Sequence, residues 1–173
     1  MAVGLPDLVD CARLAEDAAV LERAYDLREL PRIQDVLAEP RGVLDASFAF
    51  SKLPSGRAGA GVAIRAAPLL MCQRCMQGFA FPVSGGSDIE FASSESAVAV
   101  DSEREVVRAD RGLISLRELA EEELLLALPI APVCSAPQSC RAAPSLPADA
   151  EWSETSDGMR RPFSALRDLL KKT

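Results

Sequence analysis

Residues 44–51 read Leu-Asp-Ala-Ser-Phe-Ala-Phe-Ser, and this stretch decides the fold. Apolar and polar or small side chains alternate along it, which is the two-residue period of a strand with one buried face. The apolar positions of this pattern are Leu44, Ala46, Phe48 and Phe50. Turn sequences bound the stretch at residues 39–42 and 54–56, so it predicts a half-buried strand in an antiparallel sheet.

Further strands are predicted on both sides of this stretch. They cover residues 20–27, 59–67, 69–71, a segment from Phe79 to Val83, a segment at Ile89 and Phe91, and Val106 with Val107. Short turns between most of them favour a meander that curls into a sheet or partial barrel.

Helical spacing predicts four helices. The first opens at the cap residue Asp7, a short one covers 28–38, the longest covers 115–128, and a short C-terminal one covers 162–172. Ser115 and Glu118 form a capping box for the longest. The predicted class is α+β, an antiparallel meander sheet or partial barrel with N-terminal, central and C-terminal helices. We expect one domain over residues 1–173, with a loose loop rich in Pro, Ala and Ser at 134–157.

The composition excludes several classes of function. The chain has no histidine, which removes Ser-His and Cys-His catalysis and histidine metal ligands. Its 26 acidic residues against 19 basic ones give a net charge of -7, which disfavours a broad nucleic-acid face and suits a basic protein partner. Neither a signal peptide nor a membrane span is evident, so we expect a cytoplasmic protein. The sequence also lacks a glycine-rich phosphate loop, a nucleophile elbow and a Ser-x-x-Lys pair, so we expect no enzymatic activity.

Four of the five cysteines form two close pairs. Cys72 and Cys75 lie in a predicted turn, and Cys134 and Cys140 follow the longest helix. Four thiols are a ligand set for zinc, although five residues within the second pair exceed the usual two to four. A redox pair at Cys72 and Cys75, or inert reduced thiols, are the alternatives. Cys11 is expected in the core.

Two charged regions carry competing interpretations. Arg74 lies between the first two thiols, where it would lower their pKa, and it is also a predicted RNA or partner contact. The C-terminal segment has a basic cluster that either contacts RNA or complements the helix dipole, and it comprises Arg160, Arg161, Arg167, Lys171 and Lys172. Glu121, Glu122 and Glu123 are predicted as a solvated helix face rather than a metal site.

Three sequence blocks together resemble the YceD family. The first is Leu70–Met76 with Phe81-Pro82-Val83, the second is Leu116–Val133 with Cys140 after it, and the third is Arg161–Leu169. Related sequences often have a histidine where Cys134 stands, and both residue types bind zinc. The resemblance implies a role in synthesis, processing or stability of large-subunit rRNA, and it supplies no catalytic residue.

The sequence therefore favours a non-catalytic ribosome biogenesis factor that supports 23S rRNA. Expected partners are a pre-50S particle, 23S rRNA or a basic ribosomal protein, with no membrane and no small-molecule substrate. The alternative is a cysteine-based redox or zinc-binding regulatory protein.

Overall fold

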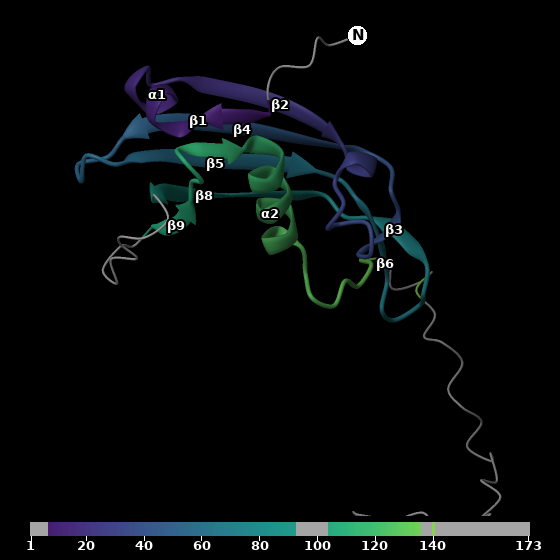
Figure 1. Cartoon of the computed structure of the whole chain (residues 1–173). Coiled ribbons are helices and arrows are strands. Elements are labelled where there is room, and N and C mark those ends of the chain that lie inside the picture. The colour runs from purple at the N-terminus through teal and green to yellow at the C-terminus, as the bar shows by residue number, and fades with distance from the viewer. Residues whose placement is uncertain (1–6, 93–103, 136–139, 141–173) are drawn as a thin grey trace, which may run out of the picture. The chain divides into compact units, whose positions relative to one another are not determined.

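A computed structural model of the chain describes residues 7–92, 104–135 and Cys140. All of these residues lie within one compact unit, Met1–Ala143. Three β-sheets and two α-helices make up this part. Figure 1 shows their arrangement from one side. The predicted C-terminal helix at 162–172 and most of the predicted loop at 134–157 lie outside the described residues.

The largest sheet has five strands in the order β2-β4-β5-β8-β9. The strands are β2 (Val20–Asp26), β4 (Val43–Lys52), β5 (Ala58–Ala66), β8 (Val83–Ala92) and β9 (Glu105–Arg108). The first four pair antiparallel, whereas β9 pairs parallel to β8. Because a parallel pair needs a crossover connection, the predicted meander is wrong at its last strand.

The remaining strands form two smaller sheets. Strand β1 (Leu8–Asp10) pairs with β10 (Leu113–Ser115), which brings the start of the described chain beside the strand that precedes the longest helix. Strands β3 (Leu37–Glu39), β6 (Leu69–Met71) and β7 (Gly78–Ala80) form a three-stranded sheet in the order β3-β6-β7. A predicted strand from Phe79 to Val83 is divided into β7 and the start of β8, with Pro82 in the break.

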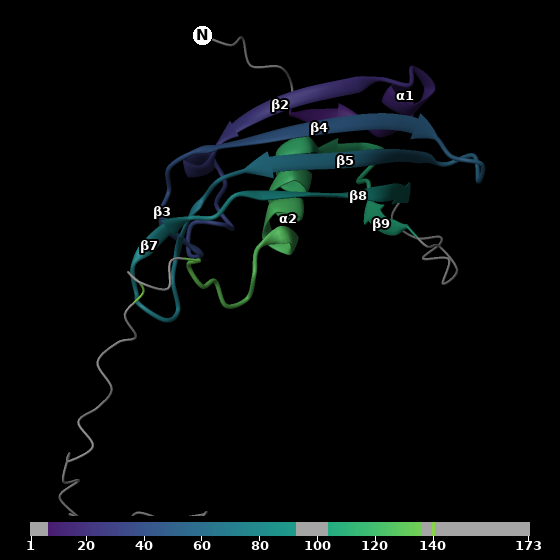
Figure 2. The same cartoon turned by 180° about the vertical axis from the view of Figure 1, so that it is seen from behind.

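Helices cover one face of the large sheet. Helix α1 (Cys11–Glu16) buries Cys11 and Ala15 against β4 and β5, and α2 (Leu116–Ala127) packs on β5 and β8. Ser115 caps α2 by accepting the Glu118 N–H at 3.3 Å. Seen from behind, β2, β4, β5 and β8 form the front layer and α2 lies behind them (Figure 2).

The core lies between this helical layer and the sheet. Leu44, Ala46, Phe48 and Phe50 of β4 all face inward and are at most 5% exposed, as their alternation predicts. The ring of Phe50 stacks on Phe91 with centroids 6.1 Å apart. Cys11 is 4% exposed, so its predicted place in the core is confirmed.

The predicted α+β class is wrong. Strands hold 47% of the described residues against 18% for helices, and the large sheet does not close into a barrel. Its edge strands are β2 and β9. At the N-terminus, Asp7 does not open a helix, because residues 8–10 extend to pair with β10 and Asp10 is the helix cap. At residues 8–10, strand pairing with a segment distant in sequence therefore outweighs the local helix propensity.

The predicted helix at 28–38 is also wrong. A 3-10 turn η1 (Leu27–Glu29) leads into further turns, and residues 37–39 form β3. The N–H groups of Arg32 and Ile33 donate to one carboxylate oxygen of Glu121, at 2.6 and 3.1 Å. These long-range bonds satisfy backbone donors that a helix ladder would otherwise use.

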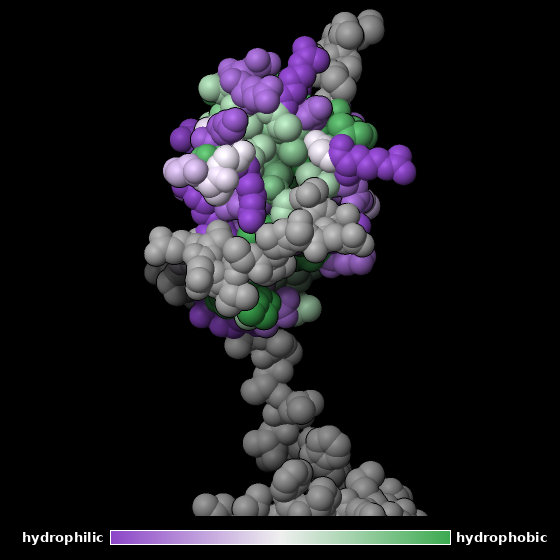
Figure 3. Space-filling view, turned by 60° about the vertical axis from the view of Figure 1, so that its left-hand side comes forward, coloured by the Kyte–Doolittle hydropathy of each residue, from purple (hydrophilic) through white to green (hydrophobic). Residues whose placement is uncertain are grey.

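Part of the surface is hydrophobic. Figure 3 shows a pale green area between hydrophilic side chains on one face of the molecule. The large apolar side chains exposed in the described part are Leu8, Val20, Val36, Val43, Met76, Leu113, Leu126, Ile130 and Val133. Among the described residues, no helix has the length and apolar character that a membrane span requires.

Candidate metal centre

The β6–β7 hairpin presents the first two thiols. Its turn is closed by backbone bonds from the Cys72 N–H to the Gln77 carbonyl, at 2.9 Å, and from the Met76 N–H to the Cys72 carbonyl, at 2.8 Å. Met76 adopts a left-handed conformation with φ of 57°. That conformation is unfavourable for a residue with a side chain, so the turn is held by its surroundings.

The segment after α2 brings the other two thiols to this turn. The Gln73 N–H donates to the carbonyl of Pro132 at 2.9 Å, which fixes the segment beside the hairpin. The Cys134 N–H then points at the Cys72 sulfur at 3.4 Å. Two parts of the chain about sixty residues apart thus meet at one point.

The four sulfurs form a compact cluster. The Sγ atoms of Cys72, Cys75, Cys134 and Cys140 all lie within 4.8 Å of one another. Cys72 and Cys140 are 3.8 Å apart and Cys75 and Cys134 are 3.9 Å apart. These separations exceed a disulfide bond of about 2.05 Å, and all the thiols are free. The cluster therefore consists of four separate donor atoms.

The dimensions of the cluster fit a tetrahedral thiolate site. A zinc–sulfur bond of about 2.3 Å implies sulfur–sulfur edges of about 3.8 Å in a regular tetrahedron. The Cys72–Cys140 and Cys75–Cys134 separations match this length, and every other sulfur–sulfur separation is within 4.8 Å, so a small side-chain adjustment would reach it. Two of the thiols, Cys72 and Cys140, are buried, and the other two are half-buried. The arrangement can hold a metal ion with four protein ligands.

Backbone and arginine donors favour negative charge at this cluster. The pKa of Cys72 is lowered to about 6, chiefly because the Cys134 N–H donates to its sulfur, and this outweighs the effect of burial. The Arg74 Nε donates to the Cys140 sulfur at 2.8 Å, and its guanidinium also reaches the Cys134 carbonyl at 3.5 Å. Four thiolates and a divalent ion carry a net charge of about −2, so one arginine offsets part of it.

The side chain of Arg74 thus donates its hydrogen bond to the sulfur of Cys140. The sequence had suggested instead that it would act on Cys72 and Cys75, the two thiols that flank it. The other predicted RNA or partner contacts, Arg160, Arg161, Arg167, Lys171 and Lys172, lie outside the described residues and stay predictions.

Sequence reasoning missed the buried carboxylates of α2. Glu121 is 1% exposed and Glu123 is 8% exposed, so the predicted solvated face is wrong at both positions. Glu121 accepts the two backbone bonds from residues 32 and 33, and Glu123 accepts a hydrogen bond from the Ser87 hydroxyl. Glu121 lies next to Ala120 and three residues before Leu124, and all three are buried. This helical spacing from apolar residues was the sequence signal that could have predicted the burial of Glu121.

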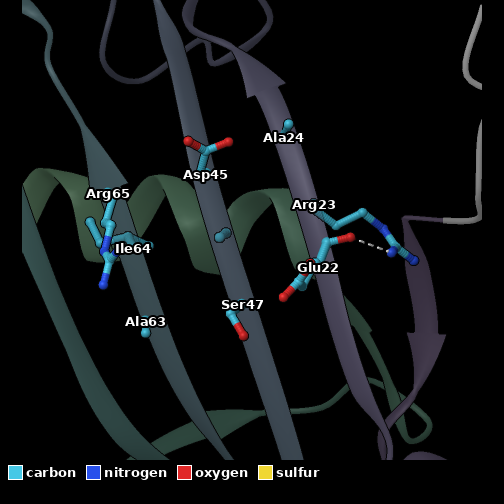
Figure 4. Close-up of a pocket in the computed structure, with 9 residues that line it drawn as sticks. Glu22, Arg23, Ala24, Asp45, Ser47, Ala63, Ile64 and Arg65 are labelled. Atoms are coloured by element: carbon cyan, nitrogen blue, oxygen red, sulfur yellow. Dashed lines mark hydrogen bonds between the residues drawn. The ribbon is translucent and has the colours of Figure 1, made fainter.

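The opposite face of the large sheet is polar and open. A shallow hollow of about 560 Å³ lies over β2, β4 and β5, where Glu22, Asp45 and Arg65 project from the strands among Ala24, Ser47 and Ala63 (Figure 4). Both carboxylates are exposed to solvent. The short side chains and solvated charges show the outer surface of a sheet rather than a reactive site.

Comparison with known proteins gives one family. The model described as "Large ribosomal RNA subunit accumulation protein YceD" matches residues 61–170, which is more than half of the chain and spans all four clustered cysteines. No curated protein and no solved structure matches the chain. The family description names an accumulation protein rather than an enzyme, and it links the family to the large ribosomal RNA subunit. The chain belongs to the YceD family.

Proposed function

We propose that this chain is a non-catalytic ribosome biogenesis factor of the cytoplasm, built as a single domain around a structural zinc ion. It binds the precursor of the large subunit and supports the processing or stability of 23S rRNA. The family match carries the link to the large ribosomal RNA subunit. The cysteine cluster supplies the physical reason for a binding role rather than an enzymatic one.

A closed four-thiolate site favours a structural ion. Catalytic zinc keeps one coordination position for water or substrate, whereas structural zinc is enclosed by four protein ligands. Here Cys72, Cys75, Cys134 and Cys140 offer one sulfur each, and Arg74 and backbone N–H groups supply the outer hydrogen bonds. An ion at this point would fix the hairpin to the segment after α2 and so shape one surface.

Zinc content is the direct test of the metal. Native mass spectrometry of protein purified without chelator should show one added zinc per chain. Cys75→Ser should lose that ion, whereas the matched control Cys11→Ser should keep it, because Cys11 lies in the core and contacts the Gly112 carbonyl. An apo mass for the unmodified chain would overturn the zinc proposal.

Sedimentation tests the function. The chain should co-sediment with pre-50S material in a gradient of cell lysate, and its deletion should lower the ratio of 23S to 16S rRNA. The variant Cys75→Ser should leave the pre-50S fractions, while Cys11→Ser should remain in them. A chain that stays at the top of the gradient, with an unchanged rRNA ratio on deletion, would contradict the proposal.

The pKa of about 6 at Cys72 favours a second candidate, a redox-regulated protein. In that case oxidation would join two of the clustered sulfurs, releasing two electrons and two protons to an acceptor disulfide. Thiol alkylation with and without glutathione disulfide distinguishes the candidates. A stable disulfide at Cys72 in the chain purified without chelator or reductant would favour redox regulation, and four thiols protected from both oxidation and alkylation would favour zinc.

Direct RNA contact is a separate part of the proposal. The basic residues from Arg160 onward would reach rRNA phosphates, which the acidic remainder of the chain repels. Truncation before Arg160 should weaken crosslinking to 23S rRNA and flatten its salt dependence. Unchanged crosslinking would show that the tail does not contact RNA.

A further inference from the structure

A groove separate from the cysteine cluster lies where α2, the β1–β10 pair and strand β9 meet. Its volume is about 790 Å³, and residues of all four elements line it. Helix α2 packs on β5 and β8, so β9 extends beyond the strands that the helix covers. Neither the zinc proposal nor the predicted RNA contacts use this part of the molecule.

The groove has an exposed apolar lining. Leu8 is 57% exposed and Leu113 is 39% exposed. They lie on the same face of the β1–β10 pair, since Leu8 pairs with Ser115 and Leu113 pairs with Asp10. Val107 and Leu119 continue this lining as half-buried side chains on β9 and α2. Contact between this surface and a partner would remove apolar area from water.

The groove is also acidic. Six carboxylates line it against two guanidinium groups, and the carboxylates belong to Glu105, Asp110, Glu118, Glu121, Glu122 and Glu123. Both arginines are already engaged, because Arg32 bonds Glu122 at 2.6 Å and Arg108 bonds Asp110 at 3.0 Å. Glu105 on β9 and Glu118 on α2 are both exposed.

We propose that this groove binds an amphipathic helix of a basic protein partner. Apolar side chains of that helix would enter over Leu8 and Leu113, and flanking Lys or Arg residues would pair with Glu105 and Glu118. This is the complement of an apolar stripe bordered by basic positions. The same carboxylates repel phosphates, so charge favours a protein partner here over RNA.

The inference rests on the proposed function in one respect, namely that the partner is a protein of the large-subunit precursor. A protein that binds rRNA carries positive charge, and a precursor of the large subunit contains many such proteins. A segment of one of them that has not yet docked on rRNA would present Lys and Arg beside apolar residues. The groove would hold that segment on the precursor particle.

The first experiment measures a helical probe against the full chain. A fluorescent peptide of about four turns with a Leu stripe and flanking Lys residues should bind, and the same peptide with Glu in place of Lys should not. The variant Glu105→Lys with Glu118→Lys should weaken binding roughly tenfold or more. The double variant Leu8→Ser with Leu113→Ser should weaken it roughly fivefold.

The outer sheet face supplies a matched control. The double variant Glu22→Lys with Asp45→Lys changes net charge by the same amount on the face of Figure 4, which the proposal leaves free. Its affinity should remain within roughly twofold of the unmodified chain. If both charge reversals weakened peptide binding equally, the effect would come from the net charge of the whole chain, and the proposal would be overturned. Unchanged binding in the groove variants would also overturn it. Circular dichroism must show that each variant is folded.

Sedimentation separates failure of this inference from failure of the proposed function. If the unmodified chain co-sediments with pre-50S particles, the groove variants should shift to free fractions and the outer-face variant should not. Retention of the groove variants on the particle overturns the groove as the partner site while the proposed function stands. Absence of the unmodified chain from the particle contradicts the proposed function, and the peptide result then decides the groove chemistry alone.

Discussion

The five-stranded sheet and the three-stranded sheet of this protein are built on different principles. In the large sheet, β4 and β5 pair over nine consecutive positions, and their inward side chains join one apolar core. In the small sheet each strand has three residues, and the β3–β6 register shifts between Leu37 and Glu39. Fully buried side chains in its strands and turn are few, with Leu70 and Cys72 at 0% exposure.

The difference teaches where each region obtains its stability. Long strands with a continuous apolar face bury enough surface to order themselves against α1 and α2. Short strands with little core do not, and small folds of this kind depend on crosslinks or metal ions. The small sheet carries the cysteine turn, so the proposed ion lies beside short strands rather than in the core of the large sheet.

Metal removal should have the largest effect on stability, and it should destabilise the small sheet much more than the large sheet. A strong chelator, or the variant Cys72→Ser, removes a binding free energy on the order of 10 kcal/mol at the cysteine cluster. Hydrogen exchange should accelerate at β6 and β7, while β4 and β5 stay protected because their core is apolar. Cys11→Ser should keep both the metal and the protection of β6. Equal loss of protection in both sheets would contradict this division.

Truncation in the large core should give the next largest effect. Phe48 is completely buried, so Phe48→Ala should lower the free energy of unfolding by about 3–5 kcal/mol in urea titration. Val20→Ala, at a side chain 65% exposed on the same sheet, should change it by less than about 0.5 kcal/mol. The folded fraction of the Phe48 variant should still bind one zinc, and loss of metal there would show that the cluster depends on the core.

Glu121→Gln tests a contact that local sequence did not predict. The carboxylate accepts two backbone N–H bonds from the turn before β3, and charged acceptors make stronger bonds than amides. We expect a loss of about 1–2 kcal/mol in unfolding free energy, with faster hydrogen exchange at Arg32 and Ile33. Glu122→Gln, which removes only the exposed pair with Arg32, should cost about 0–1 kcal/mol. If both variants lost the same unfolding free energy, the stabilisation would come from surface charge rather than from the two backbone hydrogen bonds of Glu121.

Tyr25 should give the smallest effect. Its hydroxyl donates to Asp7 at 2.9 Å, so Tyr25→Phe should cost about 1 kcal/mol. Burial, and then the hydrogen bond and charge of Asp7, raise the pKa of this phenol. The folded state therefore favours the protonated form, and this contribution is complete below the unfolded pKa of about 10 and is lost as pH rises above it.

Alkaline absorbance can measure this shift cleanly, because Tyr25 is the chain's one tyrosine. Phenolate should appear only well above pH 10, together with unfolding. Ionisation at an ordinary pKa in the folded chain would contradict the geometry at Asp7.

Strand positions in the large sheet were predictable because the pattern is local. Large apolar side chains in residues 44–51 alternate with polar or small ones, and one face of β4 is buried as that period requires. The turn before β3 was not predictable, since Leu30, Ile33 and Leu37 have helical spacing but the backbone donors are taken by a carboxylate almost ninety residues away. The parallel pairing of β9 with β8 could not be predicted from the sequence either, because the residues of so short a strand do not encode the direction of pairing.

The sequence by itself determined the main strands, the range in which α2 lies, the cysteine pairs and the family resemblance. Each of these depends on residue types at short spacing, where the period of a strand, a helix or a turn limits the choices. Only the tertiary structure decided that the described fold is mostly β, that Glu121 and Glu123 are buried, and that four sulfurs meet within 4.8 Å. These features join segments distant in sequence, and burial and long-range hydrogen bonds outweigh local propensity there because they satisfy groups that no neighbouring residue can reach.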